Sequence, residues 1–498
     1  MNSVAIRPQR GSKRRRLLLT AAAVLVILFL AAAIVAHHYW PFTESAVRED
    51  LASDTGAKVR FGSFHQRLFP PGCVAENVVF QRDDSPEPFM TVQKLTVRAY
   101  LTGMFRNHVN LVRAEGLHAI LGRSDFNKNN YSQRQTSIVD RLVADDAVLE
   151  VRRNLPQSNL RFVFHKFTMK NLGEGGTVEF AAAFDNPMPR GLLRTSGRFG
   201  PWKGQDAAET PVSGEYSLEQ ADLSVFGGIS GAISSVGDFR GTFKQMEIAA
   251  SASSPGFEIT KTLHALPLET RFTASVNATD GDVALHQVSA KFGRNVIEAQ
   301  GMIGRGVNGK RAANLVLRCE RGRIEDVFYP FIHSPTSPLT GDVAFTMKVT
   351  VPSGREPFLQ KLELGSDFQI HNAKFTKERT QNKLNEIAEG PHQKDPTDTL
   401  SDFQGTVAVT GGVARFSSLS VHDQSATAKF HGSFGLINER VNMQGNLKTA
   451  TSLAKTTSGI SSVFAKVLEP FFKKRPHETI VPVKIGGTYS HPSFGLNM

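Results

Sequence analysis

Apolar and polar side chains alternate one by one over many short stretches of this chain. In the stretch 342–351, Val343, Phe345, Met347 and Val349 alternate with polar or small residues. Successive side chains of a strand point to opposite faces, so this stretch predicts a strand with one apolar face. We expect further strands of this kind over 58–64, 73–82, 90–101, 109–123, 160–171, 177–184, 271–278, 426–436 and 441–447.

The turns between these stretches favour antiparallel neighbours. Asp280-Gly281, directly after the strand 271–278, is a dipeptide typical of a two-residue hairpin. Asp145-Asp146 is interpreted as a turn between two short strands within 143–151. The pattern therefore predicts a mainly β protein.

Helical patterns interrupt the strands at three places. The first is a short helix with Thr43 as its N-cap, Val47 and Leu51 on one face, and Gly56 at its end. The second is expected near 374–388. The third, near 458–474, carries an apolar stripe at helical spacing.

One uniformly apolar segment, residues 17–36, has neither alternation nor a charge. A helix of this length spans about 30 Å, the thickness of a bilayer's hydrocarbon core. Six Lys or Arg residues precede it, which predicts a single-pass anchor with the N-terminus in the cytoplasm and the bulk of the chain across the membrane. A cleaved signal peptide is the alternative, but its apolar region is normally only about 7–15 residues long.

Charge and cysteine content exclude several classes of function. The chain has 58 Lys and Arg against 46 Asp and Glu, a net charge of +12. Because six of the basic residues precede the apolar segment, the remainder is only mildly basic, and we expect no nucleic-acid binding. Cys73 and Cys319 are the only cysteines and lie far apart, so neither a disulfide framework nor a zinc site is expected.

The candidate catalytic motifs each lack an essential part. The stretch 304–310 fits GxxxxGK, but Arg311 stands where a P-loop needs Ser or Thr to hold magnesium. Ser230 lies in GISGA, which lacks the last glycine of a nucleophile elbow. His37-His38 directly follows the apolar segment and suits a membrane interface better than a metal site. We therefore expect no catalytic residues, no metal and no cofactor, and hence no enzyme.

Three groups of motifs resemble a known family. They are Thr55-Gly56 with the strands that follow it up to VRAEGL at 112–117, the series GRFGPW at 197–202 with the glycine-rich stretch 227–241, and the ending IVPVKIGGTYSHPSF at 480–494. Together they resemble the AsmA-like envelope proteins of the AsmA/TamB-type bridge-like lipid transfer superfamily.

This resemblance implies a transmembrane helix followed by an elongated, twisted antiparallel β-groove with a few short helices. The expected regions are a basic segment and anchor at 1–41, an N-terminal AsmA-like region at 42–136, a repetitive middle region at 137–340 and a C-terminal AsmA-like region at 341–498.

The resemblance also implies a protein of the inner membrane with its bulk in the periplasm, acting in phospholipid transport and homeostasis of the cell envelope. The expected partners are membrane phospholipids, the inner membrane through 17–36, and other envelope proteins. The alternative is a scaffold or assembly factor for outer-membrane proteins. The alternating pattern alone leaves open whether the apolar faces form an open trough or a sealed sandwich. The candidate lipid-binding residues are Leu95, Val97, Phe272, Val276, Val343, Phe345, Met347, Val349, Phe430, Phe434, Leu436 and Met443.

Overall fold

The structure is a computed structural model of the 498-residue chain. It describes residues 40–82, 86–100, 108–121, 138–152, 159–173, 176–203, 206–259, 264–305, 311–332, 335–354, 356–376, 401–422, 426–449, 479–488 and 491–496. The predicted anchor at 17–36 and the predicted helix at 458–474 lie outside the described residues. Within them, no helix combines the length and the apolar character needed to cross a membrane.

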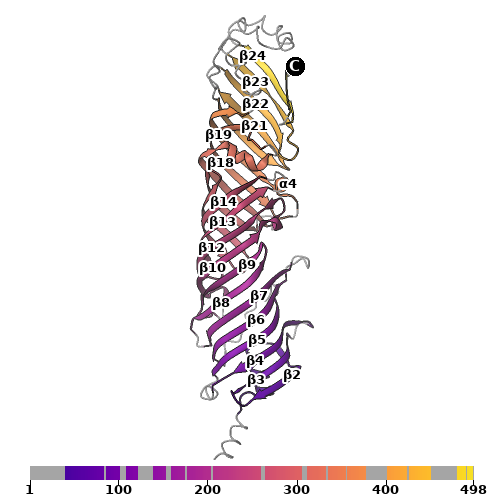
Figure 1. The fold of residues 1–498 in the computed structure, drawn as a ribbon, viewed down its shortest axis with the longest axis vertical. Coiled ribbons are helices and arrows are strands. Elements are labelled where there is room, and N and C mark those ends of the chain that lie inside the picture. Colours follow the sequence, from indigo (N-terminus) through magenta and orange to yellow (C-terminus); the bar gives the residue numbers. More distant parts are fainter. Residues whose placement is uncertain are drawn as a thin grey trace, which may run out of the picture. The chain divides into compact units, whose positions relative to one another are not determined.

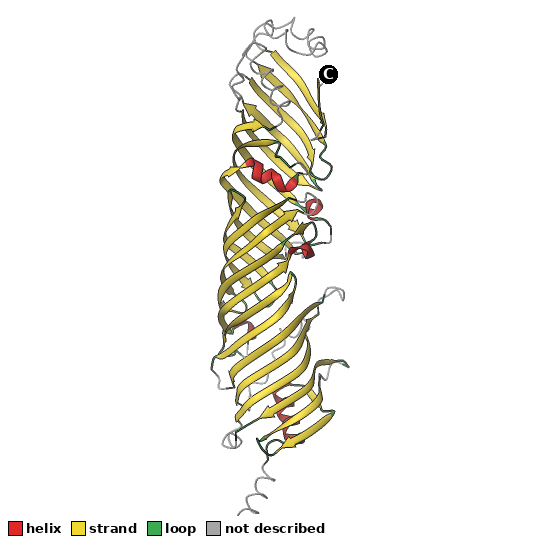
Figure 2. Cartoon of the chain, viewed as in Figure 1, coloured by secondary structure: helices red, strands yellow, loops and turns green. Residues whose placement is uncertain are grey.

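The described chain is mainly β, as predicted, and Figure 2 shows few and short helices beside the strands. The chain divides into two compact units. Unit 1 comprises residues 1–119, 130–145 and 171–174, and unit 2 comprises 120–129, 146–170 and 175–498.

Unit 1 begins with helix α2 (Glu44–Thr55). The Thr43 hydroxyl accepts a hydrogen bond from the Ala46 amide, and Gly56 ends the helix in the left-handed conformation, both as predicted. The strands of unit 1 are β1 (Lys58–Arg60), β2 (Ser63–Arg67), β3 (Gly72–Gln81) and β4 (Pro88–Arg98). Strand β3 pairs in antiparallel fashion with each of the other three.

Three strands contribute residues to both units. They are β5 (His108–Leu121), β6 (Ile138–Val151) and β7 (Leu160–Leu172).

Unit 2 is an antiparallel ladder in which nearly every strand pairs with its neighbours in the chain. Figure 1 shows the labelled strands of this unit following one another in chain order. Its further strands are β8 (Val178–Pro187), β9 (Arg190–Phe199), β10 (Pro211–Asp222), β11 (Ile229–Ser230), β12 (Ala232–Thr242), β13 (Met246–Ile259), β14 (Ala265–Asn277), β15 (Asp282–Phe292), β16 (Asn295–Arg305), β17 (Arg311–Arg323), β18 (Leu339–Pro352), β19 (Glu363–Phe375), β20 (Ser401–Thr410), β21 (Val413–His422), β22 (Ala426–Gly435), β23 (Val441–Thr449), β24 (Thr479–Gly487) and β25 (Pro492–Leu496).

Short helices lie in the connections of this ladder. They are η4 (Ala207–Glu209), η5 (Leu223–Phe226), α3 (Ile324–Phe328), η6 (Tyr329–Phe331) and α4 (Phe358–Lys361). The predicted hairpin at Asp280-Gly281 is confirmed, since β14 and β15 pair on either side of it.

One local prediction was wrong, and a second differs from the structure at its start. Residues 143–151 are part of one continuous strand, β6, because Asp146 takes a positive φ of 53° inside the strand and no chain reversal follows. The helix expected near 374–388 does not begin at Lys374, because β19 continues through Phe375 and pairs with β18 there. The residues of that prediction beyond 376 lie outside the described chain.

Candidate lipid-binding face of unit 2

A single row of apolar residues crosses the ladder of unit 2 from β7 to β23. Each member lies directly opposite the next across an antiparallel pair, and directly opposed residues project from the same face of a sheet. We call this row the apolar file. Its members are Met169, Phe180, Gly197, Gly214, Phe239, Ile248, Ala274, Leu285, Gly301, Leu315, Val349, Leu364, Val409, Ala414, Phe434 and Val441.

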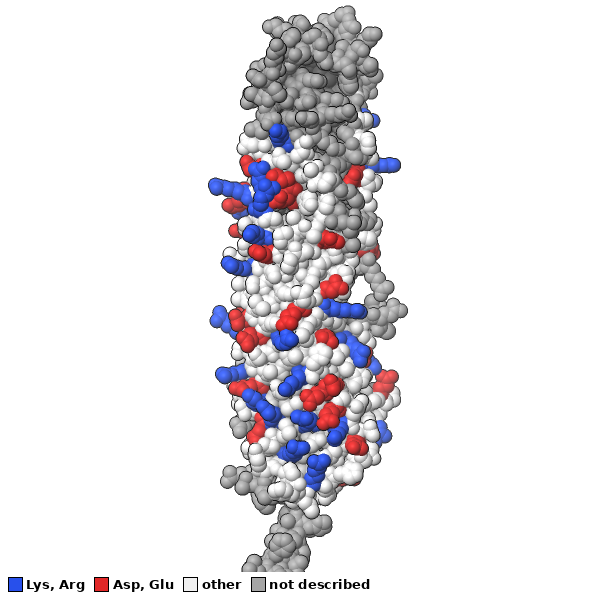
Figure 3. All heavy atoms as spheres, viewed as in Figure 1, with Lys and Arg blue, Asp and Glu red and all other residues white. Residues whose placement is uncertain are grey.

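The opposite face of the same strands is polar. A second row of directly opposed residues lies three residues from the apolar file on most strands, and four on β15 and β21, where a bulge intervenes. Its members are Lys166, Ala183, Arg194, Ser217, Val236, Ser251, Arg271, Ser289, Glu298, Arg318, Thr346, Asp367, Thr406 and Ser418. Figure 3 shows basic and acidic side chains interspersed over the face in view. A surface of this mixed charge is typical of a face in contact with water.

Most large side chains of the apolar file keep part of their surface exposed. Ala274, Val349, Val409 and Ala414 are buried. The other large members are only partly buried; they are Met169, Phe180, Phe239, Ile248, Leu285, Leu315, Leu364, Phe434 and Val441. A file sealed beneath a second layer would bury its Phe and Leu side chains completely. This face is therefore not sealed along its length.

Most of the candidate residues in unit 2 share the face of the apolar file. Val349 and Phe434 belong to the file. Seven others lie on the same strands an even number of residues away; they are Phe272, Val276, Val343, Phe345, Met347, Phe430 and Met443. Leu436 directly follows the end of β22. Leu95 and Val97 are buried in β4 of unit 1.

Helix α3 covers one section of this face. Val343 and Phe345 are buried in a cluster with Ile324 of α3, and Val327 and Phe328 of the same helix pack against that cluster. The two candidate residues are therefore packed against protein, whereas Val349 lies farther along β18 outside this cluster.

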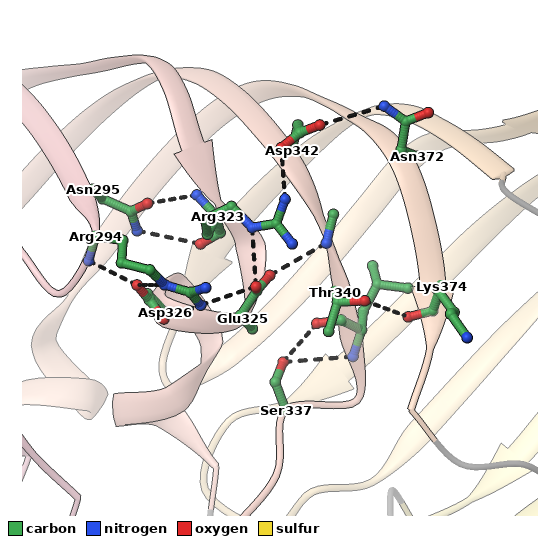
Figure 4. A network of polar contacts seen from close by, with 12 residues as sticks. Arg294, Asn295, Arg323, Glu325, Asp326, Ser337, Thr340, Asp342, Asn372 and Lys374 are labelled. Carbon is green, nitrogen blue, oxygen red and sulfur yellow. Dashed lines mark hydrogen bonds and ion pairs between the residues drawn. The ribbon is translucent and has the colours of Figure 1, made fainter.

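A polar network holds α3 in place (Figure 4). The Arg294 guanidinium donates hydrogen bonds to both Asp326 oxygens at 2.8 and 3.0 Å, and Arg323 donates to Glu325 at 3.0 Å and to Asp342 at 2.7 Å. The hydrogen bond from Arg294 is the main reason that the pKa of the Asp326 carboxyl lies below its ordinary value.

Asn295 anchors the start of the same helix from a completely buried position. Its side-chain amide donates to the Arg323 carbonyl at 3.3 Å, and its side-chain oxygen accepts from the Arg323 amide at 2.5 Å. Sequence analysis did not single out these residues. The acidic first turn of α3, Glu325-Asp326, was the only local signal for this helix.

The two long sides of the unit 2 sheet, where the strands begin and end, meet at one point. Helix η5 follows the end of β10, and α4 follows the end of β18. Because these two strands run in opposite directions, the two connections lie on opposite long sides of the sheet. The ammonium of Lys361 in α4 donates to the Phe226 carbonyl at 3.4 Å. A Cβ on Gly228 would lie 2.6 Å from the backbone nitrogen of Phe358. We call this contact of residues 226–228 with 358–361 the edge bridge.

A second contact links connections that are distant along the ladder. His264, in the connection from β13 to β14, stacks on Tyr329 of η6 with ring centroids 4.2 Å apart. The Nδ1 of the same histidine lies 3.0 Å from the Tyr329 carbonyl oxygen. Together with the edge bridge, this contact shows that the sheet of unit 2 curls between β10 and β18.

One polar cluster contains the residue types of a serine hydrolase but has a different geometry. Ser275 donates to Glu247 at 2.6 Å and contacts Nε2 of His286, and the same Nε2 lies 3.8 Å from Glu247. A catalytic relay needs the acid and the hydroxyl on different imidazole nitrogens. The cluster lies on the polar face and links neighbouring strands there. Among the described residues, no group of three or more His, Cys, Asp or Glu side chains is placed to hold a metal ion.

Comparison with known proteins gave no matching family model, no similar curated protein and no similar solved structure.

Proposed function

We propose that this protein binds the acyl chains of phospholipids along the apolar file and assists their movement through the cell envelope. In this proposal residues 17–36 anchor the chain in the inner membrane, as the resemblance to AsmA-like proteins implies, and the rest lies in the periplasm. The observation that carries the proposal is the continuity of the apolar file, which crosses the ladder without a polar residue while its large side chains stay partly exposed.

The energetics favour such a surface for a lipid tail. Each methylene exposed to water costs about 0.8 kcal/mol, so an acyl chain of ~15 methylenes costs on the order of 12 kcal/mol. A file of Phe, Leu, Ile and Val side chains removes most of this cost along its entire length. No nucleophile, metal or energy-coupling group is needed for the tail to remain on the file.

The curvature of unit 2 explains how a tail stays on the file. Between β10 and β18 the edge bridge joins the two long sides of the sheet, so a bound acyl chain cannot leave sideways there. We expect the partly exposed Phe272 and Val276 to line the path, with Phe430 and Phe434 farther along it. Val349 and Met443 are buried, and Met347 packs against the cluster beneath α3. Val343 and Phe345 instead hold α3.

Site-specific photo-crosslinking in membranes tests the proposal. The photoreactive residue p-benzoylphenylalanine replaces Leu285 or Phe434 on the apolar file in the full chain. Its matched control replaces Val236, an apolar residue on the polar face that is 56% exposed. We expect crosslinks to radiolabelled phospholipid from positions 285 and 434 and few from position 236.

Equal labelling at all three positions, or none at 285 and 434, would contradict the proposal. The variants Leu285→Asp and Val236→Asp add a second comparison. The first should reduce the lipid that copurifies with the protein, and the second should not, with circular dichroism unchanged in both.

A further inference from the structure

The turn from β2 to β3 in unit 1 projects two apolar side chains into solvent. Leu68 is 74% exposed and Phe69 is 84% exposed. Tyr100, just after β4, is 63% exposed. Single exposed apolar residues are common, but an exposed group of this kind marks an interaction surface.

These three residues belong to one tip of unit 1. The Ala99 amide donates a hydrogen bond to the Pro71 carbonyl at 2.9 Å, which joins the end of β4 to the turn. Gly72, the first residue of β3, lies opposite Arg67 on one side and Arg98 on the other. We call Leu68, Phe69 and Tyr100 the apolar tip.

The two charged side chains that flank Gly72 at the apolar tip are both basic. Arg67 and Arg98 are exposed and flank Gly72 on the same face of the sheet. The stretches 57–75 and 94–114 contain no Asp or Glu. Their seven basic residues are Lys58, Arg60, Arg67, Lys94, Arg98, Arg106 and Arg113, of which Lys94 and Arg113 lie 3.9 and 3.8 Å from the carboxylates of Glu115 and Asp145.

We propose that the apolar tip inserts into the headgroup region of an anionic lipid membrane, with Arg67 and Arg98 contacting lipid phosphates. Aromatic and aliphatic side chains at a loop tip enter this region favourably, and arginine binds phosphate through its planar set of donors. The two stretches that form the tip contain no carboxylate, so they add no repulsion against an anionic surface.

The position of the tip in the chain favours a membrane over a protein partner. Only residues 37–67 separate the apolar tip from the apolar segment 17–36, so an anchored chain keeps the tip near a bilayer. This inference rests on the proposed anchor at 17–36 but not on lipid binding by unit 2.

Depth-dependent quenching in lipid nanodiscs tests the proposal on the full chain. Leu68→Cys is labelled with the polarity-sensitive fluorophore NBD, and the two native cysteines are buried. The matched control is Met188→Cys, at an exposed turn of unit 2 where Met188 is 48% exposed. Nanodiscs contain either phosphatidylcholine alone or phosphatidylcholine with phosphatidylglycerol, each with a spin-labelled lipid as quencher.

We expect strong quenching and a blue shift at position 68 in the anionic discs, and neither change at position 188. Adding Phe69→Ser to the labelled protein should reduce the quenching at least twofold. Arg67→Gln with Arg98→Gln should weaken the response to anionic lipid about fivefold for each arginine. These variants change exposed residues only, and circular dichroism checks that the fold is kept.

Several results would overturn the proposal. Equal quenching at positions 68 and 188 would place the tip no nearer the bilayer than any other turn. Quenching that is the same in neutral and anionic discs would remove the role of the arginines. Shielding of position 68 only after a protein is added would assign the tip to a protein partner instead.

Discussion

The two units use the same alternation of apolar and polar residues but differ in what covers the apolar face. In unit 1, Cys73, Ala75 and Val78 of β3 are completely buried, and α2 contributes the buried Val47. In unit 2, the Phe and Leu side chains of the apolar file stay partly exposed. Among the described residues of the chain, the largest completely buried side chain is that of Val78, in unit 1. Alternation thus identifies a strand and its apolar face, but not whether that face is sealed.

Covered and partly exposed sections of an apolar face also occur within unit 2. The five-residue helix α3 covers Val343 and Phe345, which are buried, whereas Phe434 on the same face is partly exposed. Covered and open sections of one face can therefore be compared by substitutions of the same kind.

The largest difference is expected for a charge placed on each type of face. Val78→Asp puts a carboxylate into a site with no exposure, and we expect it to destabilise unit 1 by more than about 4 kcal/mol. Leu285→Asp, on the partly exposed apolar file, should cost about 1 kcal/mol because water reaches the carboxylate. Urea unfolding followed by circular dichroism, with limited proteolysis to locate the change, measures both. Equal costs would mean that the apolar file is as sealed as unit 1.

A truncation series sharpens the comparison within unit 2. Phe345→Ala should cost about 3–4 kcal/mol, because it leaves a cavity beneath α3. Phe434→Ala removes a partly exposed ring and should cost only about 1 kcal/mol, since fewer of its contacts are with protein. The shifts in the urea midpoint, with an unchanged dependence of the free energy of unfolding on urea concentration, give the two losses of stability. A Phe434→Ala cost as large as that of Phe345→Ala would indicate a second covered section.

The edge bridge distinguishes a curled sheet from a flat one. Gly228→Ala places a Cβ 2.6 Å from the Phe358 nitrogen at a residue with a φ of +82°. We expect a cost of about 1–3 kcal/mol and faster hydrogen exchange in both η5 and α4. Gly411→Ala is the control, because Gly411 has a φ of +62° but a Cβ at that residue would meet no atom within 4 Å. Exchange that changes equally in η5 and α4 of both variants would show that the bridge is not a specific contact.

The smallest effect concerns the network that holds α3. The pKa of Asp326 is lowered by the hydrogen bond from Arg294, so the pair contributes stability above the ordinary carboxyl pKa, and this contribution is lost as the pH falls through the lowered pKa. We expect a contribution below about 1 kcal/mol, since Arg294 is largely exposed. Asp326→Asn should therefore lower the urea midpoint at pH 7 but not at pH 2, whereas Asp238→Asn, a change at an exposed carboxylate of β12, should alter neither. A midpoint loss in Asp326→Asn that is the same at both pH values would assign the effect to packing.

Local signals predicted most elements of the fold, because their causes lie within a few residues. Thr43 and Gly56 determine the ends of α2, and Asp280-Gly281 determines the β14–β15 hairpin. The continuous course of β6 was missed, because Asp146 adopts a positive φ within a strand, where a turn is the usual outcome.

The features that decide how the face is covered have no local signal. The edge bridge joins Gly228 to Phe358, and only the accumulated twist of the strands between them brings these residues together. Helix α3 is too short for its periodicity to be visible, and its position depends on Arg294, more than one strand earlier. Candidate residues on alternating strands could therefore be assigned to a face, but not to its open or covered sections.

The neighbour-to-neighbour pairing of unit 2 has a consequence for how such a chain changes in evolution. From β13 to β25 each strand pairs with the strand before it in the chain, and the apolar file gains one member with nearly every strand. Duplicating one hairpin would therefore extend the ladder by about 10 Å without redesigning a core elsewhere. The length of the ladder can therefore change in steps of one hairpin.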